Sequence, residues 1–164
     1  MHTVLVAYAS KHGATAEIAS SIGAVLESAG IEAEVRSPDE VGGVNRYDGA
    51  VIGSAVYAGH WLAAAKEFVT REAAPLATKP VWLFSSGPLG DPAKPVEEPV
   101  DVPSIREQTG ARDHRIFPGR LLRRELGMGE RAIAAVVRAP DGDFRPWDEV
   151  MDWAAGIART LKEV

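Results

Sequence analysis

The 164-residue chain contains no cysteine, which excludes disulfide bonds, thiolate catalysis, iron–sulfur clusters and cysteine-type zinc sites. It also lacks any apolar run near the roughly 20 residues that span a membrane. The first apolar stretch, residues 3–9, is only as long as a strand, which predicts a strand rather than a secretion leader. Basic residues are outnumbered, and the formal net charge of −5 disfavours nucleic-acid binding. We therefore expect a soluble, cytoplasmic protein with a single domain over residues 1–164.

The opening stretch, residues 3–15, is the most informative part of the chain. Apolar and β-branched residues from Thr3 to Ala9 give way to small and polar residues, and a helical pattern of apolar residues follows. Strand, short loop and helix are typical of a phosphate cradle, because loop N–H groups and the positive end of the helix dipole converge there. Ser10 and Thr15 add hydroxyl groups, and Gly13 lets the backbone approach an anion closely. The alternative is an ordinary strand-to-helix turn with a hydroxyl residue at the helix start.

The rest of the chain alternates strands with helices, which predicts a parallel sheet covered on both faces. Further strands are expected at residues 31–36 (an edge strand, because its residues alternate), 48–54, 80–86 and 114–118. Helices are expected at residues 14–29, from 62 to about 74 with Pro75 closing it, at 104–110, and from Pro146 onward. Residues 91–103 are rich in proline and predicted to be irregular. An additional segment at about 121–145 fits either two short helices or a helix and a strand.

Three loops follow strands at one edge of this sheet, where parallel sheets bind their ligands. Residues 10–15, Ser-Lys-His-Gly-Ala-Thr, resemble the flavodoxin phosphate loop Thr/Ser-x-Thr-Gly-x-Thr, with His12 where flavodoxins usually carry threonine. Residues 54–60 and 85–91 resemble the two flavodoxin loops that hold the isoalloxazine ring. The pattern Ile-Gly-x-x-x-x-x-Gly-His at residues 52–60 resembles the flavodoxin-domain group that includes menaquinone-dependent protoporphyrinogen dehydrogenase.

The resemblance implies an α/β, three-layer flavodoxin-like fold with a five-stranded parallel sheet in the order 2-1-3-4-5 and helices on both faces. It implies FMN as the cofactor, no metal, and no protein nucleophile or general acid. The implied activity is that of an oxidoreductase or electron carrier with a redox partner protein or a quinone, protoporphyrinogen dehydrogenase-like in its finer form. The implied cofactor-binding residues are Ser10, Lys11, His12, Gly13, Ala14, Thr15, Ala55, Val56, Tyr57, Ala58, Gly59, Ser85, Ser86, Gly87, Pro88 and Gly90.

Aromatic and basic residues near these loops have two interpretations each. The loop after the fourth strand lacks the ring-stacking tyrosine of flavodoxins, so Tyr57 or Trp61 is expected to stack on the ring, although Trp61 also fits the core. We expect Trp82 in the core and His60 at the start of a helix rather than in catalysis. A basic run within residues 112–124 is either a solvated face or a docking patch for a carboxylate-bearing substrate, an acidic partner or an anionic membrane surface.

Three other functional classes are considered on the same scaffold. A receiver-like signalling module needs acids after the first strand and an aspartate at the end of the third, where this chain has Ala9-Ser10 and Gly53-Ser54. A nicotinamide-dependent dehydrogenase needs Gly-x-Gly-x-x-Gly after the first strand, where only Gly13 is present. A non-enzymatic signalling or binding domain that has lost FMN stays open as the main alternative.

Overall fold

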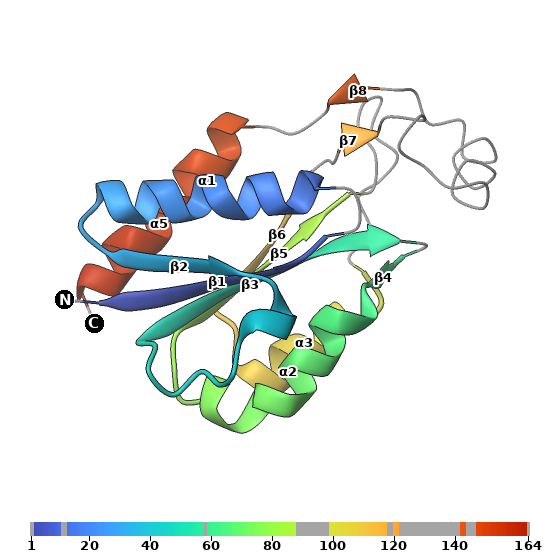
Figure 1. The fold of residues 1–164 in the computed structure, drawn as a ribbon, viewed down its shortest axis with the longest axis horizontal. Coiled ribbons are helices and arrows are strands. Elements are labelled where there is room, and N and C mark those ends of the chain that lie inside the picture. The colour runs from blue at the N-terminus through green and yellow to red at the C-terminus, as the bar shows by residue number, and fades with distance from the viewer. Residues whose placement is uncertain are drawn as a thin grey trace.

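The structure is a computed structural model that describes residues 2–10, 13–57, 59–87, 99–117, 120–121, 142–143 and 147–163. Its central sheet has five parallel strands in the order β2-β1-β3-β5-β6 (Figure 1). Taken in chain order, these parallel strands have the predicted order 2-1-3-4-5. Their bounds are β1 Thr3–Ala9, β2 Glu32–Arg36, β3 Gly49–Tyr57, β5 Val81–Ser86 and β6 Asp113–Phe117.

Within the described residues, four helices and several small elements accompany the central sheet. The helices are α1 Ala14–Ser28, α2 Ala63–Leu76, α3 Val102–Thr109 and α5 Trp147–Glu163, with a 3-10 turn η1 at Pro38–Glu40. The short strand β4, His60–Trp61, pairs antiparallel with the end of β3. A separate two-stranded sheet joins β7, Arg120–Leu121, to β8, Gly142–Asp143.

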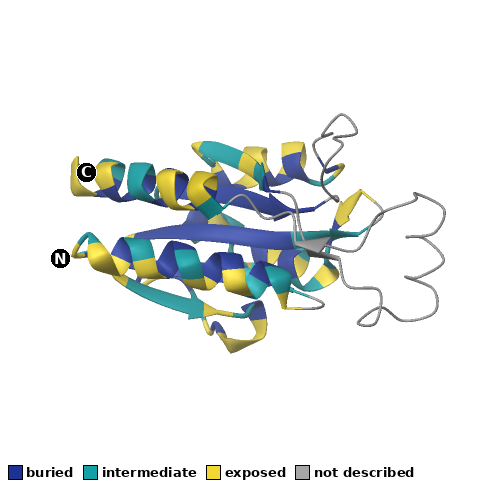
Figure 2. Cartoon of the chain, turned by 90° about the horizontal axis from the view of Figure 1, so that it is seen from above, coloured by how far each residue is buried: buried dark blue, intermediate teal, exposed yellow. Residues whose placement is uncertain are grey.

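The sheet separates two apolar layers because its central strands are apolar on both faces. Along β1, Val4 and Val6 pack with α1 and α5, whereas Leu5 and Ala7 pack with α2 and α3. Figure 2 shows the consequence: the strand in the middle is buried, and the helices beside it expose only their outer faces. The predicted three-layer architecture is confirmed.

Several predicted boundaries differ from the structure. Helix α2 continues to Leu76, because a proline so close to the end of a helix removes only one of its last hydrogen bonds. Helix α3 begins at Val102, inside the segment predicted to be irregular. Pro103 is tolerated there because an amide in the first helical turn has no helical partner. The predicted loop residues 91–98 and most of the additional segment 121–145 lie outside the described residues.

No long helix connects β2 to β3; the chain instead crosses the sheet as a strap, residues 37–48, that includes η1. Val41, Val44 and Tyr47 of the strap are buried against the same layer as α2. The Tyr47 hydroxyl and the Arg46 guanidinium, which lies 2.6 Å from a Glu34 oxygen, hold the pKa of Glu34 below its ordinary value. A short apolar strap therefore covers a part of the sheet where a helix is absent.

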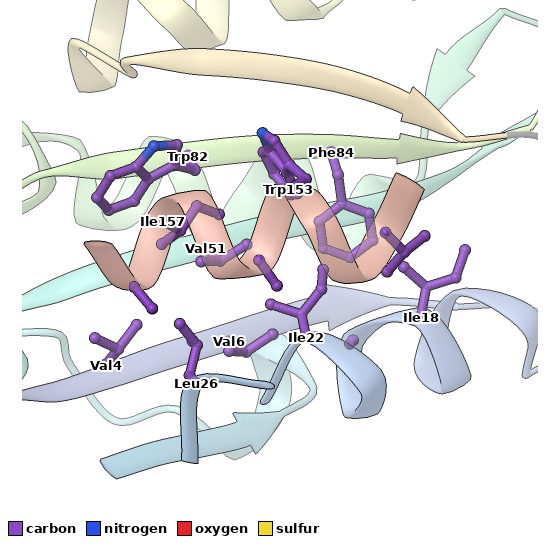
Figure 3. Packing of buried hydrophobic residues seen from close by; sticks show 14 of the residues in the cluster. Val4, Val6, Ile18, Ile22, Leu26, Val51, Trp82, Phe84, Trp153 and Ile157 are labelled. Atoms are coloured by element: carbon purple, nitrogen blue, oxygen red, sulfur yellow. The ribbon is translucent and has the colours of Figure 1, made fainter. Parts of the chain in front are cut away.

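An aromatic cluster fastens α5 to the sheet (Figure 3). The ring of Phe84 lies 6.4 Å from that of Phe117 and 6.3 Å from that of Trp153, both measured between centroids. Phe84 also lies directly over Gly53 of the neighbouring strand, where a β-carbon would come within 2.1 Å of the ring. Glycine at position 53 is therefore required for this packing.

Replacing Gly53 with alanine is expected to destabilise the fold by at least about 2 kcal/mol, because the buried Phe84 ring has to move. Urea denaturation followed by circular dichroism measures the change. The control is Gly42→Ala, since a β-carbon at Gly42 meets no atom within 4 Å. Equal unfolding free energies for the two variants would contradict the proposed packing role.

A second contact of α5 is polar and depends on pH. The Trp153 indole N–H donates to Asp113 at 3.0 Å, and the Arg115 guanidinium donates to the same carboxylate at 3.1 Å. Burial raises the pKa of Asp113, but these hydrogen bonds and the charge of Arg115 outweigh it and leave the pKa below its ordinary value. The ionised carboxylate therefore stabilises the folded state at any pH above the ordinary pKa of an aspartate. This contribution is lost as the pH falls through the lowered pKa of the folded protein.

Asp113→Asn is accordingly expected to cost roughly 0.5–1.5 kcal/mol at neutral pH, the range for one net hydrogen bond at a half-exposed site. The difference from the wild-type protein should shrink in acid, where the wild-type carboxylate is protonated as well. Urea unfolding of both proteins across the acidic range measures it, with exposed Asp39→Asn as the control. A difference that stays constant with pH would argue against a stabilising charge on Asp113.

Candidate functional site

The carboxyl ends of three neighbouring strands meet at one edge of the sheet. The pairing registers place Ala9 of β1 opposite Ser54 of β3, and Ala55 of β3 opposite Ser86 of β5. The carboxyl ends of these strands therefore lie side by side, at the same edge of the sheet in Figure 1. The strand ends that lead into the three loops singled out by the sequence are brought together as predicted.

The first loop has the geometry of an anion cradle. Gly13 has a φ of 86°, a conformation that side-chain-bearing residues rarely adopt, and it directly precedes α1. Its N–H donates to the Ser10 hydroxyl at 3.0 Å, which closes the turn. The first helical hydrogen bond runs from Glu17 N–H to Gly13 C=O, so the three preceding amides of α1 have no helical acceptor. These amides and the helix dipole favour a bound anion.

Other predicted residues of this loop differ in their positions. Thr15 lies within the first turn of α1 and is 1% exposed. Ala14 opens the helix. Lys11 and His12 lie outside the described residues. His12 is the position where the loop departs from the flavodoxin pattern.

The second loop was predicted to begin where the strand ends at Ser54, but β3 continues to Tyr57 and forms a β-hairpin with β4. Ala55, Val56 and Tyr57 belong to β3, and Val56 and Tyr57 pair with Trp61 and His60 of β4. The β-branched and aromatic residues favour this pairing. Gly59 turns the chain with a φ of 81°, and Ala58 lies outside the described residues. We call the paired residues 56, 57, 60 and 61, together with Gly59, the ring hairpin.

The third loop begins at Gly87, because Ser85 and Ser86 belong to β5. Gly87 has a φ of 92°, and its N–H donates to the Phe117 carbonyl at 2.7 Å. A β-carbon at Gly87 would lie 3.8 Å from the Val56 carbonyl oxygen, so the second and third loops lie next to each other. Pro88 and Gly90 lie outside the described residues.

The burial of the aromatic side chains decides which of them belong to the core. Trp61 is 2% exposed and donates its indole N–H to the Ser85 hydroxyl at 2.8 Å, so it belongs to the core and not to a stacking surface. Trp82 is buried in β5, as predicted. Tyr57 is half-buried at the end of β3 and is the aromatic side chain of the ring hairpin that lies nearest its tip.

His60 lies in β4 and not at a helix start, since α2 begins at Ala63. Its Nδ1 atom lies 3.2 Å from a carboxylate oxygen of Asp101. That carboxylate also accepts the Trp61 amide N–H at 3.0 Å and lies 3.8 Å from the Lys66 ammonium. Nothing in the sequence indicated Asp101, because it lies forty residues away from its partners.

Within the basic run, the described side chains of Arg112, His114 and Arg115 contact other residues of the fold. The Arg112 guanidinium lies 5.8 Å from the centre of a Trp82 ring, and Arg115 pairs with Asp113. His114 places its Nε2 atom 2.8 Å from the Ser85 hydroxyl oxygen. Arg123 and Arg124 lie outside the described residues. Across the described helices, we find none with the length and apolar character needed to cross a membrane.

Comparisons with known proteins agree with this geometry. A family model described as a flavodoxin domain matches residues 5–145. A search of curated proteins gave no significant match. The fold is similar to that of a flavodoxin from the domain Archaea, with 17% identity, a TM-score of 0.65, and coverage of 98% of this chain and 99% of that one. Flavodoxin 1 from Bacillus cereus is similar at 16% identity and a TM-score of 0.60, covering 98% and 97% of the two chains.

A larger protein contains the same fold. The rubredoxin oxygen:oxidoreductase from Desulfovibrio gigas aligns with 99% of this chain at 12% identity and a TM-score of 0.68, but only 37% of that protein is covered. At these low identities, the structural similarities show a shared fold and nothing more. The family match covers most of the sequence, and on that ground the chain belongs to the flavodoxin domain family.

Proposed function

We propose that this protein is an FMN-dependent oxidoreductase or electron carrier. Membership of the flavodoxin domain family implies FMN as the cofactor. One observation carries the proposal: each of the three loops at the ligand edge holds a glycine with positive φ, Gly13, Gly59 and Gly87. Such glycines allow backbone to approach a bound group closely, and all three follow strands that end at the same edge of the sheet.

The residues present fit the two parts of FMN. The amides in the first turn of α1 and the turn closed by Ser10 suit a phosphate group. The ring hairpin and Gly87 provide backbone N–H and C=O groups beside a flat ring, and Tyr57 provides an aromatic face worth about 0.5–1.5 kcal/mol. FMN, when bound, supplies the electron-transfer chemistry, and the chain binds it, orients it and restricts water.

A finer proposal concerns the substrate. We infer a protoporphyrinogen dehydrogenase-like activity with a quinone as the electron acceptor, in the cytoplasm, supported by the Gly-His pattern at Gly59 and His60. Contact with an anionic membrane surface through residues 112–124 would bring the protein close to a quinone dissolved in that membrane. Oxidation of protoporphyrinogen in the presence of a soluble quinone tests it. A protein that binds FMN but does not oxidise this substrate would leave an electron carrier as the function.

The cofactor itself is tested by titrating the purified protein with FMN and recording the visible spectrum and the quenching of flavin fluorescence. Saturable binding at micromolar FMN is expected. Absence of binding would favour the alternative of a signalling or binding domain that has lost FMN.

Thr15→Val is expected to weaken FMN binding by about 1–3 kcal/mol, roughly 5- to 150-fold in the dissociation constant, because a phosphate oxygen loses its hydroxyl donor. The matched control is Thr78→Val, whose hydroxyl donates to the Pro75 carbonyl at 2.7 Å and lies before β5, at the opposite edge of the sheet. Equal affinities for the two variants would show that the first loop does not bind the phosphate.

A further inference from the structure

The ring hairpin is held by side chains from outside it, and Trp61 is where they meet. The indole N–H of Trp61 donates to Ser85 in β5 at 2.8 Å. The amide N–H of the same residue donates to the carboxylate of Asp101, directly before α3, at 3.0 Å. Trp61 is 2% exposed, and its indole bond to Ser85 is buried, whereas its amide bond to Asp101 is partly buried. One residue of the hairpin is thus tied to two separate parts of the fold.

Each of the two acceptors is itself fixed. The Ser85 hydroxyl is fully buried and also bonds the Nε2 atom of His114 in β6, at 2.8 Å. The Asp101 carboxylate, 19% exposed, lies at the amino end of α3, where the helix dipole favours a negative charge. The Asp101 side chain makes no capping hydrogen bond to α3. Its oxygens instead accept the Trp61 amide N–H and lie close to the His60 ring and the Lys66 ammonium.

The backbone adds two further ties. The Val100 N–H donates to the Gly59 carbonyl at 2.9 Å, next to the hairpin turn. The Leu62 N–H donates to the buried Ser54 hydroxyl at 2.9 Å and closes the base of the hairpin. Gly59, His60 and Trp61 therefore each bond residue 100 or residue 101.

These ties matter because β4 has only two residues. A two-stranded ribbon of that size is not stable alone in water. Without external anchors the hairpin would sample many conformations, and a ligand would have to order it on binding, which lowers affinity.

We propose that Trp61, held by Ser85 and Asp101, is a positioning residue that preorganises the ring hairpin for FMN. This inference rests on the proposed function, because it assigns the hairpin to the flavin ring. Trp61 itself does not touch the ring; it acts through the backbone conformation of residues 56, 57 and 59–61. The proposal extends the cofactor site from the loops to a polar network in the layer that contains α2 and α3.

The test begins with the protein free of FMN, by hydrogen exchange of amides 56–62 read by mass spectrometry. Trp61→Phe removes the indole N–H and keeps an aromatic ring, and Asp101→Asn removes the charge and keeps the shape. Both are expected to raise exchange in this segment about tenfold, with exchange of β1 unchanged. Unchanged exchange at 56–62 in both variants would overturn the proposal.

The matched control is Trp153→Phe, which removes another indole hydrogen bond of 3.0 Å, to Asp113, in the opposite layer. It should leave exchange at 56–62 as in the wild-type protein. If Trp153→Phe raises exchange there as much as Trp61→Phe does, the effect is general destabilisation and the proposal fails. A Trp61→Phe/Ser85→Ala double variant should be no worse than the more affected single variant, because the two changes break one shared bond.

The same proteins are then titrated with FMN. Trp61→Phe and Asp101→Asn should weaken binding about tenfold, and Trp153→Phe should not. Normal affinity in variants whose hairpin exchanges faster would overturn the positioning role while leaving the proposed function intact. If the wild-type protein binds no FMN, the proposed function is wrong, and the exchange data alone then decide whether the anchors order the hairpin.

Discussion

The alignment of β5 on β3 is the constraint on which the rest of the site depends. It is fixed on one face of the sheet by the Phe84 ring, which fills the space left by the missing side chain of Gly53. In a strand, successive side chains point to opposite faces, so the residue after Phe84 faces the other layer. That residue is Ser85, and it lies where the Trp61 indole reaches it. A shift of one residue would exchange the two faces, placing the hydroxyl among aromatic rings and leaving the indole without its partner.

The two layers consequently have different chemical roles. Between α1, α5 and the sheet, the packing is mostly apolar, and its aromatic cluster holds the strands and the last helix together. Between α2, α3 and the sheet, an apolar core also contains buried polar groups near the carboxyl ends of the strands. Each buried hydroxyl described there, at Ser54 and Ser85, accepts an N–H from the chain around β4. Buried polar groups are costly unless they are paired, and here their pairing determines the shape of a surface hairpin.

Sequence reasoning recovered the parts of this structure that are coded locally. The run of apolar residues in β1, the glycine at position 13 and the helical pattern of α1 follow one another directly, so the first loop and its anion-binding geometry were predictable. The second loop was predicted at the correct place along the chain, but its hairpin pairing was missed, because two residues are too few for a strand pattern to be recognised in β4. Asp101 and His114 were missed for a different reason: their partners are distant in sequence, and no local pattern marks a carboxylate that bonds a backbone amide forty positions away.

The anion cradle and the ring hairpin differ in what fixes their geometry. The anion cradle is built mainly from backbone, so its geometry depends on the path of the chain and on one glycine rather than on particular side chains. The ring hairpin depends on side chains that never reach its surface, since a short ribbon has too few bonds of its own to hold one conformation. A motif search on the loops therefore detects the cradle and says little about the order of the hairpin. Within the described part of the chain, the identities of Trp61, Ser85 and Asp101 are better indicators than the loop residues of whether a related sequence keeps an ordered ring site.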